Sequence, residues 1–555
     1  MTKYIFVSGG VLSGLGKGVT AASLGVTLKA RGYKVTNIKC ENYLNLDSGN
    51  INPIEHGDVF LCEDGTEADL DLGTYERFLE QEVSLKNYTT VGQIYQSVIK
   101  ATCDLKHKGA TVDAIPYVPE EVIRRIKKAA EGFDIILIEL GGCAGEYQNI
   151  IYYEANRILK LQEPDNVIHI HVTYFPHPKH INELKSKPTQ LSVKQLNTMG
   201  IQPDFIVGRA EIDLDEKRKE KVAYYCNLSQ DDIISNPDCA SIYELPLIFE
   251  KQKFGEKTLA KLNLPIKKPE LEDWEKMVHK IKSKKAKTVK IGVIAKYLSS
   301  GDYELRDSYA SLLEAIDHAV TQVGVNLDLR FIKAEALEKG QKQALSDLHE
   351  VDGIIVPIGW GKRGVEGKIM AIQYAREQKV PYLGLCYGMQ LAVVEFARNV
   401  VGLAEANTTE VNPKTPHPVV HEIPADDQHQ TIKGEGASMR LGAYDAVLKK
   451  DSLIYQIYQK YNALKDEKQG VVSERHRHRF EVNNSYREQL SAKGLVFAGT
   501  SPDDFFVEFI ELPKTIHPFF IATQGHPEYK TRPLQPHPFF AELIKAALKK
   551  SSLSL

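Results

Sequence analysis

One segment, residues 380–390, places strict demands on the fold. It reads Val-Pro-Tyr-Leu-Gly-Leu-Cys-Tyr-Gly-Met-Gln, an apolar run that ends at Cys386 between Gly384 and Gly388. An amphipathic run at residues 389–398 follows at once. A strand that turns sharply into a helix at a thiol is typical of a nucleophile elbow in an α/β sheet, because small neighbours make the turn sterically possible. A buried structural cysteine at a strand end is the alternative.

A second apolar run near the C-terminus supplies partners for this thiol. Residues 521–528 read Ile-Ala-Thr-Gln-Gly-His-Pro-Glu, so His526 and Glu528 are two residues apart. In an extended segment such positions face the same side, and a residue before proline favours extended backbone. Cys386, His526 and Glu528 are therefore candidate catalytic residues: the imidazole takes the thiol proton, and the thiolate attacks a carbonyl carbon to form a thioester. Taken alone, the His-Pro-Glu sequence has an ordinary loop as its alternative.

Together these two segments resemble the class I glutamine amidotransferase family. The motifs that carry the resemblance are Gly384-Leu-Cys-Tyr-Gly-Met-Gln390 and Gln524-Gly-His-Pro-Glu528. The resemblance implies that Cys386 attacks the amide carbon of glutamine, that His526 is the base oriented by Glu528, and that ammonia leaves. A domain of this family makes ammonia for a second reaction. The remainder of the chain is therefore expected to hold an acceptor site.

Composition argues against several other classes of protein. The chain has 555 residues and a formal net charge of −3, without the dominant basic patch that a nucleic-acid binder requires. No apolar run reaches the ~18 residues that span a membrane, and the first residues predict a strand rather than a signal peptide. Seven cysteines without a Cys-x-x-Cys pair favour reduced thiols over disulfides or zinc. We expect a cytoplasmic enzyme without nucleic-acid or membrane partners.

Alternating apolar and amphipathic runs predict an α/β fold with two doubly wound, mostly parallel-sheet domains. In the first part, helices are expected at 18–31 and 119–131, and strands at 4–8, 34–39, 113–116, 134–140, 167–173 and 204–208. His169 and His171 are then strand residues rather than metal ligands. The charged segment at residues 266–288 predicts a solvated linker. We expect a phosphate-loop synthetase domain at 1–265, the linker at 266–288 and a glutamine amidotransferase domain at 289–548.

The glycine-rich loop at residues 7–18 is the main sign of chemistry in the first domain. It follows an expected strand and opens an expected helix. Glycines free backbone N–H groups to surround phosphate oxygens, the helix N-terminus adds a favourable field, and Lys17 can reach the outer phosphates. A strict Walker A motif requires glycine where the chain has Val11, and serine or threonine where it has Gly18. We interpret the loop as a variant phosphate loop in which Ser13 supplies the missing hydroxyl; a glycine-rich turn without a ligand is the alternative.

Two acidic places are candidate metal sites. Residues 63–71 are dense in carboxylates, and Glu139 lies near the end of the apolar run that starts at Ile135. Carboxylates at strand tips beside a phosphate loop commonly hold Mg²⁺ in nucleotide enzymes. A solvated acidic loop is the alternative for each place taken alone.

Longer motifs spread over the whole chain resemble the CTP synthase family. They are Ser8–Gly18, Pro53–Gly57, Glu63–Phe78, Lys185–Gln190, Arg363–Gly367, Ser438–Gly442 and Glu474–Asn484. The resemblance implies that ATP phosphorylates O4 of UTP, that ammonia from glutamine travels through an internal passage to C4, and that phosphate leaves to give CTP. It further implies Mg²⁺ as a cofactor, GTP as an allosteric activator, and a homotetramer that can assemble into filaments.

The resemblance also assigns roles to matching residues. ATP and its transferring phosphate are expected at Ser13, Gly14, Leu15, Gly16, Lys17, Gly18 and Lys39, and Mg²⁺ at Asp71 and Glu139. UTP is expected at a set whose cations suit a triphosphate: Ser13, Lys185, Lys187, Gln190 and Lys221. Glutamine is expected at Gly359, Gln390 and Arg479, with Gly359 in the oxyanion loop. Arg440 is a candidate on the GTP side.

The chain departs from the family pattern in the oxyanion loop. Ile358-Gly-Trp-Gly361 stands where the family commonly has Gly-Gly-Phe-Gly. A β-branched Ile358 resists conformations that are open to glycine, and the loss of one oxyanion donor would reduce glutamine hydrolysis by ~10²-fold to 10³-fold. Because Gly359 is retained, we expect the activity to be present.

Further departures lie near the pyrimidine nucleotide of the family. Tyr117 replaces a histidine, Glu146 an aspartate and Gln148 a glutamate, which changes the charge and the hydrogen-bond donors there. Two alternatives therefore stay open: a paralogue that aminates a related pyrimidine-type nucleotide, and a nucleotide-binding pseudoenzyme that assembles with other chains. The complete set of candidate catalytic and phosphate-binding side chains argues against the pseudoenzyme.

Overall fold

The computed structural model describes residues 2–49, 51, 57–296, 299–300, 303–304, 306–423 and 439–553. Residues 53–56 and Ser438, which belong to two of the sequence motifs, lie outside the described residues. The chain divides into two compact units. Unit 1 comprises Met1–Asn50 and Glu67–Lys282, and unit 2 comprises Ile51–Thr66 and Ser283–Leu555.

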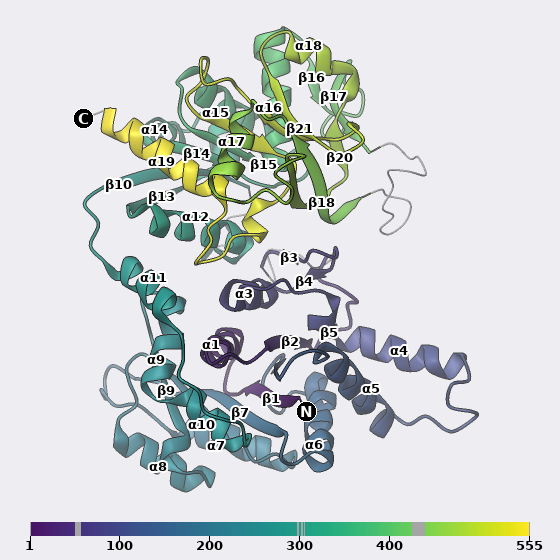
Figure 1. The fold of residues 1–555 in the computed structure, drawn as a ribbon, viewed down its shortest axis with the longest axis vertical. Helices are drawn as coiled ribbons and strands as arrows, with labels where there is room; N and C mark the ends of the chain where they lie inside the picture. Colours follow the sequence, from purple (N-terminus) through teal and green to yellow (C-terminus); the bar gives the residue numbers. More distant parts are fainter. Residues whose placement is uncertain are drawn as a thin grey trace. The chain divides into compact units, whose positions relative to one another are not determined.

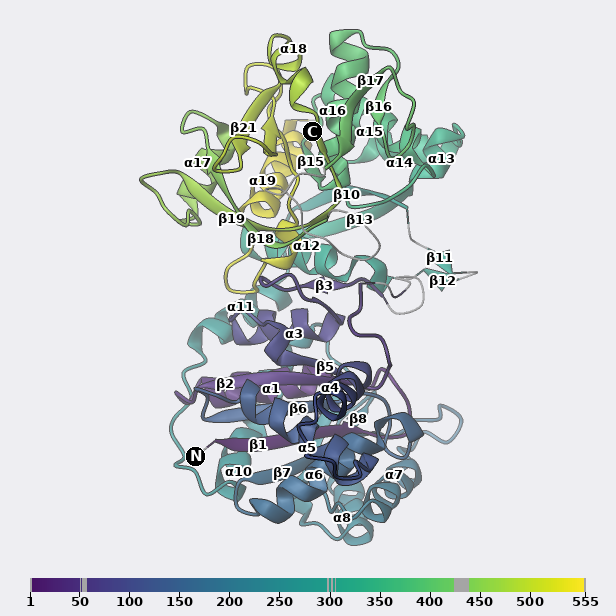
Figure 2. The same ribbon diagram turned by 90° about the vertical axis from the view of Figure 1, so that its right-hand side faces the viewer.

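The described part of unit 1 contains a seven-stranded sheet in which every neighbouring pair of strands is parallel (Figures 1 and 2). In spatial order its strands are β5 (Tyr88–Thr90), β2 (Val35–Glu41), β6 (Ile135–Leu140), β1 (Lys3–Gly9), β7 (Val167–Tyr174), β8 (Phe205–Ala210) and β9 (Ile233–Pro237). Parallel strands need crossover connections, which the helices supply.

Both faces of this sheet are buried, because the apolar side chains along each strand point alternately to either side. In β1, Tyr4 and Phe6 pack with one cluster, and Ile5 and Val7 pack with the other. The first cluster includes side chains of α4 (Val91–Cys103), α5 (Ala114–Ala129) and α6 (Ile150–Gln162). The second includes side chains of α1 (Lys17–Lys29), α9 (Leu245–Lys251) and α10 (Phe254–Lys261). The sheet is therefore doubly wound.

Most of the predicted strands of unit 1 are present, and one prediction is wrong. The predictions at 4–8, 34–39, 134–140, 167–173 and 204–208 correspond to β1, β2, β6, β7 and β8. The strand predicted at 113–116 is instead the start of α5, where Ile115 alone departs from helical angles, with φ −113° and ψ 126°. A following proline pushes a residue toward extended backbone, so this one residue imitated a strand.

Unit 2 contains a nine-stranded sheet within its described residues. Its five parallel strands are β13 (Asn326–Lys333), β10 (Thr288–Ala295), β14 (Gly353–Val356), β15 (Tyr382–Leu385) and β23 (Phe520–Thr523). Four antiparallel strands continue the sheet from β23: β22 (Val507–Glu511), β21 (Val496–Thr500), β18 (Arg440–Leu448) and β19 (Val471–His478).

Helices cover both faces of this second sheet as well. One core cluster includes side chains of α15 (Val365–Glu377) and α16 (Tyr387–Phe396). The other includes side chains of α12 (Ala310–Val323), α17 (Leu453–Lys460) and α19 (Pro538–Leu553). The predicted α/β class with two doubly wound domains is confirmed. The four antiparallel strands that continue the second sheet were not predicted. Within the described ranges, no helix is both long enough and apolar enough to cross a membrane.

Helix α11 (Glu272–Lys282), within the predicted linker, and described residues before the acidic loop contact different units. Helix α11 packs on unit 1, where the indole of Trp274 donates a hydrogen bond to the carbonyl of Tyr243 (2.8 Å). The segment Ile51–Thr66 belongs to unit 2, where Tyr529 Oη donates to the carbonyl of Val59 (3.0 Å). The backbone N–H of Ala443 donates to the carbonyl of Glu63 in the same segment (2.9 Å).

Candidate active site

The candidate nucleophile lies at a sharp turn between β15 and α16. Cys386 has φ 50° and ψ −101°, a conformation that is rare for a residue with a side chain. The turn also brings backbones into close approach: a Cβ at Gly388 would lie 2.0 Å from the carbonyl oxygen of Val356, and one at Gly384 would lie 2.7 Å from the Tyr382 hydroxyl. Glycine at both positions is therefore a steric requirement of this strand–turn–helix.

Parallel pairing of β15 with β23 brings the other candidate catalytic residues to the same edge of the sheet. Cys386 donates its N–H to the carbonyl of Thr523 (2.8 Å), and His526 follows three residues later. His526 Nδ1 lies 2.8 Å from Glu528 Oε1. All three candidates are buried, with 2% of Cys386, 0% of His526 and 5% of Glu528 exposed.

The imidazole of His526 is held in a charged form. Burial lowers its pKa, but the charges of Glu528 and Cys386 outweigh burial and raise the pKa to about 10. The ring also stacks on Tyr529, with ring centroids 5.3 Å apart. Among the described residues, none forms a hydrogen bond with His526 Nε2. At neutral pH the ring therefore carries a proton, as a base that has taken the thiol proton would.

The predicted oxyanion loop, residues 358–361, follows Pro357 and lies beside the elbow. Tyr387, the residue after Cys386, donates a hydrogen bond to the carbonyl of Gly361 (3.4 Å). Ile358 is not among the described residues with positive φ, so the strain expected from replacing a glycine by a β-branched residue does not arise. Within the described part of the chain, the buried N–H groups of Ile358 and Gly359 have no acceptor. They are available to an oxyanion.

The residues predicted to bind glutamine have different surroundings. Gln390 is buried, and its Nε2 donates to the carbonyl of Phe480 (2.8 Å). Its Oε1 has no hydrogen-bond partner in the described residues, so it is an acceptor open to a ligand. Arg479 is exposed just beyond the end of β19, and no described contact brings it to Cys386.

Two residues that the sequence reasoning missed contact the oxyanion loop. Arg477 is buried, and its guanidinium lies 4.9 Å from the ring centroid of Trp360. Glu410 Oε1 accepts the N–H of Gly361 (2.7 Å). Strand periodicity could have indicated Arg477, because residues 475 and 477 share one face of β19 and residue 479 lies beyond the strand. No sequence signal marks Glu410.

Arg440, the candidate on the GTP side, lies in a buried ion-pair cluster. It is 3% exposed and pairs with Glu481 (3.2 Å) and Glu508 (2.8 Å). Burial lowers the pKa of Arg440, but the two carboxylates raise it above the ordinary value. Its guanidinium also lies 4.4 Å from the ring centroid of Tyr444. The structure therefore holds this side chain inside unit 2, which argues against a contact with GTP.

The phosphate loop of unit 1 leads directly into α1. Gly14 and Gly16 have left-handed φ values of 73° and 78°, and Leu15 between them is buried. Lys17 begins the helix, and its Nζ donates to the carbonyl of Gly142 (3.0 Å). Ser13 is exposed and forms no hydrogen bond with the residues that the structure describes.

The structure explains why Gly18 replaces the serine or threonine of a strict Walker A motif. A Cβ at Gly18 would lie 2.3 Å from Asp71 Oδ1 and 3.1 Å from Glu139 Oε2. A side chain at this position would require the carboxylate of Asp71 to move. The two predicted metal ligands therefore lie directly against the start of α1.

Lys39 and the acidic residues of unit 1 form one charged cluster. Lys39 Nζ pairs with Asp71 and with Glu139 (2.8 Å). Burial lowers the pKa of Lys39, but the surrounding carboxylates, Asp71 first, raise it well above the ordinary value. Lys39, which is predicted to bind phosphate, therefore lies in contact with Asp71 and Glu139, which are predicted to bind Mg²⁺.

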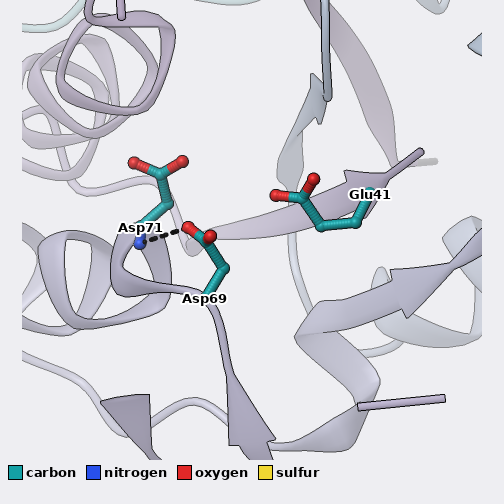
Figure 3. A group of neighbouring side chains, drawn as sticks. All are labelled: Glu41, Asp69 and Asp71. Atoms are coloured by element: carbon teal, nitrogen blue, oxygen red, sulfur yellow. Dashed lines mark hydrogen bonds between the residues drawn. The ribbon is translucent and has the colours of Figure 1, made fainter. Parts of the chain in front are cut away.

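Glu41 and Asp69 extend the metal-binding prediction. Together with Asp71 they offer carboxylate oxygens that all lie within 4.8 Å of one another (Figure 3). Asp69 caps α3 (Leu70–Leu79) by accepting the N–H of Asp71 (3.0 Å), and burial raises its pKa to about 7. A ligand set made only of oxygens suits Mg²⁺, so the residues present fit that ion.

A cationic cavity of about 300 Å³ lies in unit 1 at α7 (Lys187–Thr198) and α8 (Glu216–Cys226). Its lining residues are Glu183, Leu184, Lys185, Ser186, Lys187, Gln190, Lys217, Arg218, Lys221 and Tyr225. Every residue predicted to bind UTP except Ser13 is in this set. The divergent residues Tyr117, Glu146 and Gln148 do not line the cavity.

The two histidines of β7 form part of a buried hydrogen-bonded chain. Ser8 Oγ lies 2.7 Å from His169 Nε2 and 2.8 Å from His171 Nδ1. His171 Nε2 lies 2.7 Å from Ser192 Oγ on α7. Burial lowers the pKa of His171 to about 3, so the ring is neutral. Both histidines are strand residues, as the sequence predicts.

Comparisons with known proteins cover both units. The family model described as CTP synthase N-terminus matches residues 3–264, and the model of class-I glutamine amidotransferase matches residues 304–546. The CTP synthase of Pyrococcus furiosus is 46% identical over 549 residues, which are 99% of this chain and 98% of that protein. The CTP synthase of Caldanaerobacter subterraneus subsp. tengcongensis is 46% identical over 551 residues, with the same two shares.

Among solved structures, the glutaminase domain of Trypanosoma brucei CTPS with bound acivicin is 38% identical and has a TM-score of 0.41. The match covers 47% of this chain and 94% of that domain. The similarity to the two full-length relatives extends over nearly the whole chain.

Proposed function

The chain belongs to the CTP synthase family, and we propose that its two units carry out the two half-reactions of glutamine-dependent CTP synthesis. The enzyme is an ATP-dependent ligase that converts UTP to CTP with nitrogen from glutamine. The observation that carries this conclusion is the similarity to CTP synthases over 99% of the chain. Unit 2 hydrolyses glutamine, and unit 1 activates UTP and accepts the ammonia.

In unit 2, the reaction begins at Cys386. Its thiolate attacks the amide carbon of glutamine, and the N–H groups of Ile358 and Gly359 donate to the oxyanion. Protonated His526 gives its proton to the leaving nitrogen, so ammonia departs and a thioester remains. Neutral His526 then takes a proton from water, which attacks the thioester and releases glutamate. Glu528 orients the ring throughout, a role supported by its 2.8 Å contact.

In unit 1, ATP transfers its terminal phosphoryl group to O4 of UTP. Ammonia then attacks C4, and the phosphorylated oxygen leaves as phosphate, which gives CTP and ADP. Lys17 and Lys39 are proposed to hold the transferring phosphoryl group, because cations at that point offset its negative charge. Asp71 and Glu139, with Glu41 and Asp69 nearby, would hold Mg²⁺, which neutralises phosphate charge when it is bound.

The cationic cavity of α7 and α8 is proposed to take the triphosphate of UTP. Five cationic side chains and one carboxylate line it: Lys185, Lys187, Lys217, Arg218, Lys221 and Glu183. Phosphate oxygens accept charge-assisted hydrogen bonds from such donors. Tyr117, Glu146 and Gln148 lie outside this triphosphate lining.

Several further parts of the proposal rest on the family resemblance. They are activation by GTP, assembly into a homotetramer and filaments, and domain limits at 1–265, 266–288 and 289–548. The ranges matched by the two family models, residues 3–264 and 304–546, fall within the two proposed domains. A cytoplasmic location is also proposed, and seven free cysteines support it. Travel of ammonia through an internal passage follows from the need to keep it unprotonated and away from water.

Direct assay of the two nitrogen sources tests the proposed function. Purified protein receives UTP, ATP and Mg²⁺ with either glutamine or ammonium chloride, and CTP formation is followed by absorbance. The wild type is expected to make CTP from both sources, and Cys386→Ala from ammonium chloride alone. Absence of CTP with either nitrogen source would contradict the proposal.

A further inference from the structure

Two buried lysines of unit 2 donate hydrogen bonds to four carbonyl groups, one just before the oxyanion loop and three within it. Lys368 on α15 is 0% exposed, and its Nζ donates to the carbonyls of Pro357 (2.8 Å) and Ile358 (3.3 Å). Lys296, which follows β10, is 6% exposed, and its Nζ donates to the carbonyls of Trp360 and Gly361 (2.8 Å for Gly361).

The same two amino groups also contact the catalytic elbow. The Nζ atoms of Lys368 and Lys296 lie 5.5 Å and 5.9 Å from the ring centroid of Tyr387, the residue after Cys386. A Cβ at Gly359 would lie 3.0 Å from Lys368 Nζ and 3.4 Å from Lys296 Cδ. The loop therefore packs closely against both lysines, and the absence of a side chain at Gly359 allows this close packing.

Peptide geometry links these contacts to the oxyanion donors. A trans peptide unit is planar, and its N–H points opposite to its C=O. The carbonyls of Pro357 and Ile358 point toward Lys368, so the N–H groups of Ile358 and Gly359 point to the other side of the loop. These are the two buried N–H groups for which the described residues offer no acceptor.

We propose that Lys368 and Lys296 are positioning residues for glutamine hydrolysis. Lys368 turns the peptide units that carry the N–H groups of Ile358 and Gly359 toward the reacting amide. Lys296 fixes the next part of the loop, where the N–H of Gly361 donates to Glu410. This inference rests on the proposed function of unit 2. Neither lysine touches glutamine in this account. Each acts through the backbone of the loop.

The electrostatics of the two lysines agree with a hydrogen-bonding role. Burial, followed by repulsion from Lys296, lowers the pKa of Lys368 to about 7. Burial lowers the pKa of Lys296 to about 8, although Glu410 acts in the opposite direction. An amino group keeps N–H donors for the carbonyls whether or not it carries the extra proton.

The substitution Lys368→Met tests the inference, because methionine has a similar length and no donor. The kcat for glutamine hydrolysis is expected to fall by ~10²-fold, the effect of a misplaced oxyanion donor, with little change in KM. CTP formation from ammonium chloride is expected to stay at the wild-type rate, because it does not use the oxyanion loop. Lys362→Met is the matched control, since Lys362 is an exposed lysine of the same connection, and it is expected to change neither rate.

The outcomes separate the inference from the proposed function. A kcat within about two-fold of wild type for Lys368→Met would overturn the inference, given the size of effect expected. Equal losses with glutamine and ammonium chloride would also overturn it, because they would indicate a merely structural lysine. If Lys368→Met does not fold, Lys296→Met is measured instead: a loss of kcat with glutamine alone supports the inference, and an unchanged kcat overturns it. Failure of the wild type to make CTP from either source would contradict the proposed function instead.

Discussion

At the scale of single residues, the charge on His526 depends on its neighbours. Burial alone would leave the imidazole neutral, and the charges of Glu528 and Cys386 raise its pKa to about 10. Since the folded-state pKa is above the ordinary value, the protonated ring stabilises the fold fully below about pH 6.5, and this contribution is lost as the pH rises through about 10. As the pH rises through about 10, His526 also loses the proton that it would give to the leaving ammonia.

Glu528→Gln is expected to shift the alkaline limb of glutamine hydrolysis. Removal of the carboxylate charge lowers the pKa of His526 by ~1–3 units, so the imidazolium is lost at lower pH. The pH profile of glutamate release measures this shift, and the pH profile of CTP formation from ammonium chloride is the control. An alkaline limb at the wild-type position would contradict the role given to Glu528.

The conformation of Cys386 predicts an unusual order of stability. A side chain at φ 50° is strained, and glycine relieves that strain. Cys386→Gly is therefore expected to be more stable than Cys386→Ala by about 1 kcal/mol, close to the cost of left-handed backbone. Thermal unfolding of the two inactive variants under one set of conditions makes the comparison. An alanine variant as stable as the glycine variant would argue against strain at the elbow.

Part of the site could be predicted from local sequence, and part could not. The thiol, the imidazole and Glu528 lie in short motifs whose spacing carries the geometry. Arg477 and Glu410 depend on contacts between distant segments. Ile358 does not have the positive φ that would strain a β-branched residue. Backbone angles follow from the fold and cannot be read from residue type alone.

At the scale of elements, the cavity between α7 and α8 gives a test of nucleotide binding. Lys221→Met is expected to raise the KM for UTP by ~10-fold to 100-fold, the effect of losing one charge-assisted hydrogen bond. Glutamine hydrolysis without UTP is expected to be unchanged. Lys219→Met is the matched control, because Lys219 pairs with Glu216 on the same helix and does not line the cavity. A KM equal to that of Lys219→Met would argue against UTP in this cavity.

Elements with strong periodicity were predictable, and elements held by their neighbours were not. The long apolar strands at the centre of the first sheet could be recognised because both of their faces are buried. The short edge strand β5 has only three residues, too few to show a pattern. The predicted strand at 113–116 failed because one extended residue before a proline resembles a strand only locally. The variant phosphate loop needed the structure, since the reason for Gly18 is the contact with Asp71 from α3.

At the scale of the whole molecule, the sequence order and the units do not coincide. The segment Ile51–Thr66 lies between two stretches of unit 1 but belongs to unit 2, where Val59 and Leu61 contact Tyr529 and Arg475. The partners of Val59 and Leu61 are more than 400 positions away in the sequence. Long-range contacts of this kind cannot be read from one sequence. The division into an amidotransferase and a synthetase could be read from the sequence, because each part carries its own motifs.

The central claim is that nitrogen released at Cys386 becomes the amino group of CTP. Wild-type protein is incubated with UTP, ATP, Mg²⁺ and glutamine labelled with nitrogen-15 at the amide, without added ammonium chloride, and the CTP is analysed by mass spectrometry. The expected product is CTP that carries nitrogen-15 at the position where UTP has O4. CTP that carries only unlabelled nitrogen, or no CTP, would contradict the claim.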